Sequence, residues 1–113
     1  MEHKMKLKTP YYYYILNGTK RIEIRLNDEK RQKIKIGDTI KFTKYPELDD
    51  SFKVRVIDLL KYDSLEELMN DYNIELLADK SMSKEELLKV FEEFYTKEEQ
   101  AKYGVLGIKI ELI

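Results

Sequence analysis

Short runs of alternating apolar and polar residues dominate the first half of the chain, which is the pattern of half-buried strands. Met5 and Leu7, for example, alternate with lysines. In the run at 52–60, Ile57 and Leu59 make both faces apolar, which predicts a bulge or a strand covered on both sides. The runs predicted as strands are residues 3–8, 21–25, 39–45, 52–60 and 105–113.

Residues 10–16, between the first two strands, predict a two-turn helix. Thr9 is a typical N-cap, Pro10 suits the first helical position, and Asn17-Gly18 supplies a left-handed stop. Tyr11 to Tyr14 favour a strand by propensity, but the two end signals agree with each other and outweigh it. Because four consecutive tyrosines cover every side of such a helix, some must pack in the core while at least one lies near the surface.

The second half of the chain changes to a helical period. Three S/T-x-x-E capping boxes, which begin at Ser64, Ser83 and Thr96, each precede helix-forming sequence. A short helix at 97–103 is stopped by Gly104. Two amphipathic stripes, which we interpret as packing stripes, are formed by Leu65, Leu68, Met69 and Tyr72, and by Leu87, Leu88, Phe91, Phe94 and Tyr95.

These elements predict one α+β domain that spans residues 1–113. The expected fold is a small β-barrel of about five strands, with a helix after the first strand and a helical insertion before the last strand. A short sheet is more stable closed than with two bare edges, so the first and last strands are candidates to pair. A chain of 113 residues buries one hydrophobic core and is too short for two domains.

The charge balance excludes one broad class of function. The chain has 21 basic and 22 acidic residues, and its net charge is −1. This balance argues against a nonspecific polyanion binder, because such proteins attract nucleic acid through the field of the whole molecule. Any contact with nucleic acid must therefore come from a local basic patch.

The absence of cysteine excludes a disulfide framework and a thiolate zinc site. His3 is the single histidine and cannot build a metal centre alone, so we expect no metal and no cofactor. No apolar run approaches the roughly 20 residues that a membrane helix needs, and no signal-peptide core follows the N-terminus. We therefore expect a soluble, cytoplasmic protein that is a monomer.

A charged segment from Gly18 to Arg25 carries the strongest clue to function. Ile22 and Ile24 point to one face of the strand, and the alternate residues Arg21, Glu23 and Arg25 point to the other. These charges then converge near a flexible glycine and can anchor a phosphate, a carboxylate or a polarised carbonyl. The alternative is a solvated strand face with a cross-strand ion pair.

Lys20 does not fit this alternation, because it shares its parity with the two isoleucines. Either it stands at the mouth of the strand, where burial is incomplete, or the glycine turn releases it from strict alternation. We favour the mouth, which brings the ammonium into the same cluster of charges.

The segment Leu16 to Arg25 resembles the G-x-K-x-x-E-x-R signature of the ASCH domain family, and it matches all four fixed positions. The resemblance extends to the turn and strand at 36–40, the helical insertion and the closing stretch at 103–108. It implies a PUA-like barrel that binds RNA or a nucleoside or nucleotide ligand. In this family the signature lines a cleft beside the first helix.

By this resemblance the ligand-cleft residues are Gly18, Lys20, Glu23 and Arg25. Lys20 and Arg25 would hold a phosphate or a base carbonyl, and Glu23 would orient them or accept a hydrogen bond from an exocyclic amine. Single-stranded RNA is read through bases stacked on aromatic rings and guanidinium planes. We therefore add Arg21 and, from the tyrosine run, Tyr12 as neighbours of the cleft.

The resemblance also leaves two alternatives open. Some small bacterial proteins resembling this family are amidohydrolases that act on N4-acetylcytidine through the signature lysine, a threonine three residues on and a distant acid. Here Lys20 is present but Glu23 stands where that threonine would fall, so these two would act as electrophile and general base. Glu75 and Asp79 are the available acids. The second alternative is a noncatalytic protein-interaction module.

Overall fold

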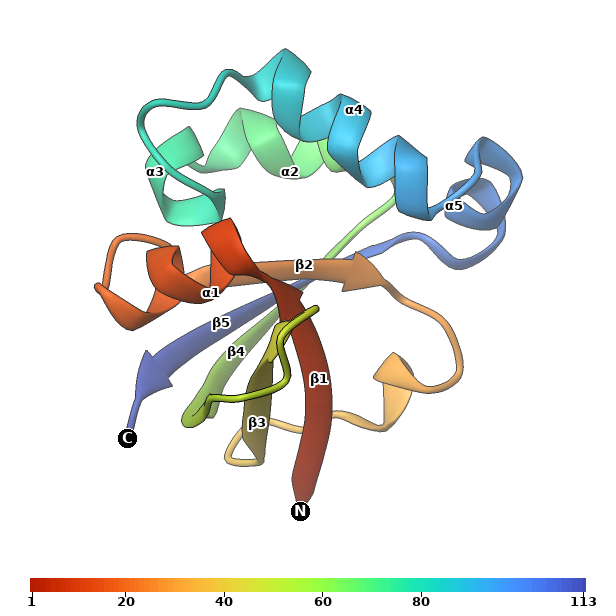
Figure 1. Cartoon of the computed structure of the whole chain (residues 1–113). Coiled ribbons are helices and arrows are strands. Elements are labelled where there is room, and N and C mark those ends of the chain that lie inside the picture. Colours follow the sequence, from red (N-terminus) through yellow and green to blue (C-terminus); the bar gives the residue numbers. More distant parts are fainter.

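The computed structural model describes residues 1–113 and contains one strongly curled sheet of five strands (Figure 1). The strand order is β1-β3-β4-β5-β2, with β1 and β3 parallel and the other pairs antiparallel. This arrangement confirms the predicted α+β fold with a curled sheet. The strands are β1 (Glu2–Lys8), β2 (Ile22–Leu26), β3 (Thr39–Tyr45), β4 (Ser51–Tyr62) and β5 (Val105–Leu112).

The sheet is a half-barrel that leaves β1 and β2 as its edges. The expectation that the first and last strands pair is wrong, because β5 lies between β4 and β2 while β1 pairs with β3. A side chain spans the two edges instead: Arg25 on β2 donates from Nη2 to the carbonyl oxygen of Lys6 on β1 at 2.8 Å. The opening between these edges is therefore bridged by a guanidinium rather than by a ladder of backbone bonds.

Strand β4 contains the predicted bulge. Its register with β5 shifts between Val56 and Asp58, so Ile57 is left out of the ladder. An extra residue of this kind bends a strand and increases its twist. Residues 51–55 of β4 pair with β3, and residues 54–62 pair with β5 on both sides of the bulge.

Helix α1 (Thr9–Leu16) follows β1 directly and confirms the predicted helix. Thr9 is not its N-cap: Lys8 occupies that position in an extended conformation, so the backbone of Thr9 is already helical. The Thr9 hydroxyl donates instead to the backbone oxygen of Tyr45 at 3.2 Å. At the other end Gly18 adopts φ of 86°, which supplies the predicted left-handed stop.

Four helices form a layer over one end of the sheet (Figure 1). Ser83 and Thr96 make complete capping boxes, and Ser64 accepts a hydrogen bond from the backbone of Glu67, so all three predicted helix starts are confirmed. Helix α3 was not predicted, because four residues are too few to show a period. The helices are α2 (Leu65–Asp71), α3 (Ile74–Leu77), α4 (Lys84–Phe94) and α5 (Lys97–Tyr103), and a 3-10 turn η1 (Arg31–Lys33) lies between β2 and β3.

Two apolar clusters pack against the sheet. One fills the half-barrel and includes Phe42 and Tyr12, each almost fully buried. The other lies between β2 and the helical layer, where Ile22 packs with Leu68 and Leu77. Strand β2 is therefore held against the helices by its apolar face, which fixes the direction of its charged face.

Gly104, which ends α5, provides a test of how closely the chain before β5 approaches the end of β4. Its φ of 76° suits glycine, and a Cβ added there would lie 2.8 Å from the carbonyl oxygen of Tyr62. We expect Gly104→Ala to lower the free energy of unfolding by about 2 kcal/mol or more, measured by urea denaturation. The control is Gly37→Ala, where φ is 95° but nothing lies within 4 Å of the added Cβ. Equal losses in the two variants would contradict this close packing.

Candidate functional site

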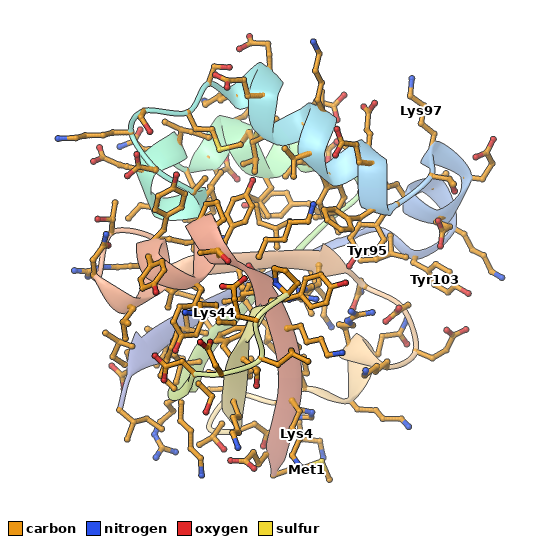
Figure 2. All side chains as sticks on the ribbon, in the orientation of Figure 1. Met1, Lys4, Lys44, Tyr95, Lys97 and Tyr103 are labelled. Carbon is orange, nitrogen blue, oxygen red and sulfur yellow. The ribbon has the colours of Figure 1, made fainter.

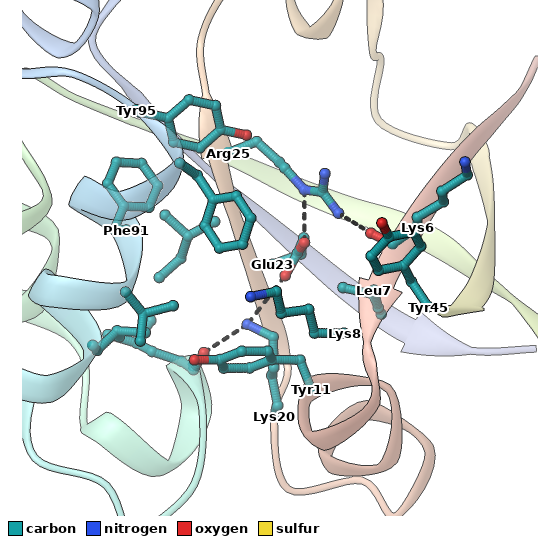
Figure 3. Close-up of a pocket in the computed structure, with 15 residues that line it drawn as sticks. Lys6, Leu7, Lys8, Tyr11, Lys20, Glu23, Arg25, Tyr45, Phe91 and Tyr95 are labelled. Atoms are coloured by element: carbon teal, nitrogen blue, oxygen red, sulfur yellow. Dashed lines mark hydrogen bonds and ion pairs between the residues drawn. The ribbon is translucent and has the colours of Figure 1, made fainter. Parts of the chain in front are cut away.

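A cavity of about 450 Å³ lies between the open edge of the sheet and the helical layer (Figure 3). Strands β1 and β2 supply its polar side through Lys6, Lys8, Glu23 and Arg25. Five aromatic rings take part in the lining, and the only carboxylate among the lining residues is Glu23. The cavity is thus apolar and aromatic on one side and charged on the other, as ligand pockets commonly are.

Helix α4 forms the apolar wall. Leu87, Phe91 and Phe94 recur at helical spacing along one face, and Tyr95 follows at the end of the helix. This is the stripe that the sequence indicated as packing. Leu87 and Phe91 do pack in the core, but Phe94 is 53% exposed and lines the cavity.

Three charged side chains form a buried network at the floor of the cavity. Glu23 Oε2 accepts from Arg25 Nε at 2.7 Å, and Glu23 Oε1 lies 3.3 Å from Lys20 Nζ. Only 3% of Lys20 and 6% of Glu23 is exposed. The structure therefore brings these three predicted residues together around one hollow.

Lys20 is more deeply buried than predicted, so its placement at an incompletely buried strand mouth is wrong. Strand β2 begins at Ile22, and the turn at Gly18 releases Lys20 from the strand alternation. Its Nζ donates to the carbonyl oxygens of Ile22 at 2.5 Å and of Leu77 at 2.6 Å. Together with Glu23, these partners occupy all three N–H donors of an ammonium. Lys20 thus holds β2 to the end of α3.

The pKa values follow from burial and from the neighbouring charges. Burial raises the pKa of Glu23, but the charges of Arg25 and Lys20 outweigh it, so that pKa lies below its ordinary value. Burial lowers the pKa of Lys20 in spite of Glu23. Burial lowers the pKa of Arg25, but Glu23 and the Tyr95 phenol outweigh this effect, so that pKa lies above its ordinary value. Glu23 is therefore ionised at neutral pH and Arg25 is a permanent cation.

Arg25 is the member of the network that keeps free donors. A guanidinium has five N–H groups, and the bonds to Glu23 and to the Lys6 carbonyl use two of them. Its side chain is 15% exposed and lines the cavity, with the Tyr95 phenol pointing toward it (Figure 3). A ligand in the cavity can therefore receive hydrogen bonds from Arg25 without disrupting the network.

A family model for the ASCH domain matches residues 5–113. The chain belongs to the ASCH domain family. It is similar to the hypothetical protein PH0355, whose crystal structure shares 40% identity, with a TM-score of 0.88 and full coverage of both chains. It is also similar to the Pyrococcus furiosus protein PF0455, solved by NMR, at 37% identity and a TM-score of 0.80 over 100% of this chain and 98% of that chain. None of the curated proteins matches the chain.

This ASCH domain does not bring every predicted residue to the cavity. Gly18 and Arg21 line a second hollow of about 300 Å³ beside β5, and Arg21 is exposed. Tyr12 is 1% exposed and packs on Phe52 with ring centroids 4.8 Å apart, which corrects its assignment to the cleft. Tyr11 lines the cavity instead, because successive helical residues point about 100° apart and Tyr12 faces the sheet.

The two acids considered for an enzyme lie outside the cavity of the ASCH domain. Neither Glu75 nor Asp79 is among its lining residues. The Asp79 carboxylate accepts hydrogen bonds from the backbone and hydroxyl of Ser81, in the loop after α3. Glu23 thus has no second carboxylate in the cavity that could act with it in catalysis.

Several lining residues of the ASCH domain were missed from the sequence. Lys6 and Lys8 belong to a strand in which lysines alternate with apolar residues, but the sequence carries no signal that this strand is the sheet edge beside the cavity. Tyr45 and Phe94 carry no such signal, since each reaches the cavity through the packing of distant elements.

No helix of the ASCH domain is long and apolar enough to cross a membrane. The structure also contains no group of three or more His, Cys, Asp or Glu side chains placed to hold a metal ion.

We expect Glu23→Gln to lower the free energy of unfolding of the ASCH domain by about 3 kcal/mol, because it leaves two cations at the floor without a counter-charge. The control is Glu2→Gln, which removes an exposed ion pair with Lys53 and should change the free energy of unfolding much less, because water screens an exposed pair. Both are measured by chemical denaturation at pH 7.

The pH dependence of this loss has a definite sign. Because folding lowers the pKa of Glu23 below its ordinary value of 4.5, its contribution is complete above that pH. The difference in stability between wild type and Glu23→Gln should therefore shrink as the pH falls below 4.5. A difference that stays constant down to pH 3 would contradict an ionised, paired Glu23.

Proposed function

We propose that this ASCH domain binds RNA, or a nucleotide, by enclosing a single nucleotide unit in the cavity of Figure 3. One observation carries the proposal: a wall of aromatic rings faces a guanidinium with unused donors across about 450 Å³. A base needs such a pair of surfaces, because its faces stack on rings and its edge takes hydrogen bonds. The PUA-like fold is itself commonly linked to RNA binding.

The charge of the cavity supports a phosphorylated ligand. Four cationic side chains and one carboxylate line it, although the whole chain has a net charge of −1. This is the local basic patch that nucleic-acid contact requires in a protein of balanced charge.

The charged side chains of the cavity differ in exposure between its floor and its rim. Lys20 and Glu23 are buried at the floor, whereas Lys6 and Lys8 are exposed at the rim. Lys8 reaches toward α4, where its Nζ lies 4.7 Å from the ring centroid of Phe94 (Figure 3). We assign the space beside the aromatic wall to the base and these rim lysines to the phosphate.

The shape indicates how a strand would bind. A cavity of about 450 Å³ has the size of a site for one small ligand, so a strand of RNA would turn one base out of its stack to fill it. Single-stranded segments allow this at least cost, which makes them the expected partner.

We expect Lys8→Ala to weaken the binding of a short single-stranded RNA about threefold to tenfold, because it removes one cation from the rim. Affinity should fall as salt rises, and the dependence should be shallower in the variant. Fluorescence anisotropy with a labelled RNA hexamer measures both effects.

The matched control is Lys4→Ala, on the same strand and with the same charge and exposure. Lys4 does not line the cavity and lies near the end of β1 that carries Met1, away from the helical layer (Figure 2). Equal loss in the two variants would show that binding is nonspecific attraction to the basic face of β1. No binding by the wild type at low salt would overturn the proposed function.

Hydrolysis of an acylated nucleoside such as N4-acetylcytidine is the second candidate, favoured by the size of the cavity. Water would attack the acyl carbonyl, Glu23 would accept its proton, and the amine would leave protonated. The chemistry at the floor opposes this, because the lowered pKa of Glu23 makes it a weak base and Lys20 has no free donor.

An acetate-release assay with N4-acetylcytidine separates the two candidates. Binding without turnover predicts release equal to a buffer blank. Release above the blank that Lys20→Met abolishes, in a variant shown to be folded by circular dichroism, would establish hydrolysis instead. Methionine is chosen because it is unbranched, is only one atom shorter than lysine and leaves Glu23 paired with Arg25.

A further inference from the structure

Two lysines at the rim of the cavity each lie beside an exposed aromatic ring that another element supplies. Lys6 Nζ is 5.7 Å from the ring centroid of Tyr45, the last residue of β3. Lys8 Nζ is 4.7 Å from that of Phe94, the last residue of α4. Tyr45 is 43% exposed and Phe94 is 53% exposed. Each pair therefore offers a cation and an uncovered ring, the two kinds of contact by which proteins hold single-stranded nucleic acid.

The charges of these two lysines are not neutralised within the protein. Both side chains are exposed, and neither Lys6 nor Lys8 takes part in any ion pair of the structure. Lys44 provides the contrast, because it lies over the ring of Tyr13 but pairs with two carboxylates, those of Glu47 and Asp49. The charges at the cavity rim thus remain available to an anion.

The spacing of the two lysines suits a sugar–phosphate backbone. Lys6 and Lys8 are two residues apart on one face of β1, which at about 3.3 Å per residue separates their Cα atoms by about 6.6 Å. Neighbouring phosphates along a nucleic-acid strand are separated by a similar distance. The side chains also point apart, Lys8 toward the helical layer and Lys6 toward Tyr45 (Figure 3). They are therefore placed for two phosphates rather than for one.

We propose that the cavity takes an internal nucleotide of an RNA strand, which Lys6 and Lys8 hold through the phosphates on its two sides. This inference rests on the proposed function. The base of the nucleotide enters the cavity, and the neighbouring bases lie against the rings of Tyr45 and Phe94. The inference decides between the two ligands that the proposed function allows, because a free nucleoside monophosphate has one phosphate and no neighbouring base.

The first test measures how well small ligands displace a labelled RNA hexamer of mixed sequence, by fluorescence anisotropy. The competitors are the 5′-monophosphates, the 3′-monophosphates and the 3′,5′-bisphosphates of adenosine and uridine. We expect each bisphosphate to compete about threefold to tenfold better than either monophosphate of the same nucleoside. Lys6→Ala and Lys8→Ala should each remove this advantage, because either change leaves one phosphate without its cation.

Lys4→Ala is the control for the added charge of a bisphosphate. Lys4 is an exposed lysine on the same face of β1, but it does not line the cavity. The advantage of the bisphosphates should persist in this variant. An advantage that Lys4→Ala removes as well would reflect nonspecific attraction and would overturn the inference.

The second test asks whether the neighbouring bases contribute. We expect a trinucleotide to bind about tenfold more tightly than the 3′,5′-bisphosphate of its middle nucleoside, and Tyr45→Ala to reduce this gain. The matched control is Tyr13→Ala, because Tyr13 is 45% exposed and lies beside a lysine but does not line the cavity. A gain that Tyr45→Ala leaves unchanged would overturn the placement of a neighbouring base on this ring.

The outcomes keep the inference separate from the proposed function. Equal competition by monophosphates and bisphosphates overturns the inference, whereas binding of the hexamer in the same experiment still supports the proposed function. Binding of the free nucleotides without binding of the hexamer also overturns the inference and leaves nucleotide binding as the function. Binding of neither the hexamer nor any nucleotide overturns the proposed function itself.

Discussion

The structure depends on one buried carboxylate held between two cations. Glu23 pairs with Lys20 and Arg25. Lys20 also donates to the carbonyl oxygen of Leu77 at the end of α3, and Arg25 donates to that of Lys6 on β1. Charges taken out of water are tolerated only when they are paired and hydrogen-bonded. The helical layer, strand β2 and the opposite sheet edge must therefore come together for the network to be satisfied.

The open half-barrel provides the space that a closed barrel would lack. Because β1 and β2 do not pair, the gap between them is crossed by the Arg25 guanidinium and covered by the helical layer. Helix α2 packs closely on the sheet at Gly107 of β5. A Cβ on Gly107 would lie 3.0 Å from Leu68 and 3.2 Å from Ile22. Side chains that line the cavity thus also hold the fold together, which explains why such polar groups are buried in so small a domain.

The sequence predicted those features that depend on local chemistry. The alternation around Ile22, the capping residues Ser83 and Thr96, and the stop at Gly18 each act within a few residues, and each is present in the structure. The burial of Lys20 was not predictable in this way, because its partner Leu77 is 57 residues away along the chain.

The choice among the tyrosines was also beyond the sequence, because it depends on the rotational setting of α1 against the sheet. A consecutive run carries no apolar period that could place Tyr11 in the cavity and Tyr12 in the core. The same holds for α4, whose stripe reads as packing although Phe94 remains half exposed. An apolar residue that lines a cavity has the same sequence pattern as a core residue. The two differ only in whether another element packs on the side chain, which the sequence does not show.

The most direct test of this account is an NMR titration of the isotope-labelled domain with a short single-stranded RNA. The account predicts that the backbone amide shifts that change most belong to residues around the cavity, among them Tyr11, Arg25 and Phe94. Changes centred instead on Gly18 and Arg21, at the second hollow, would contradict it.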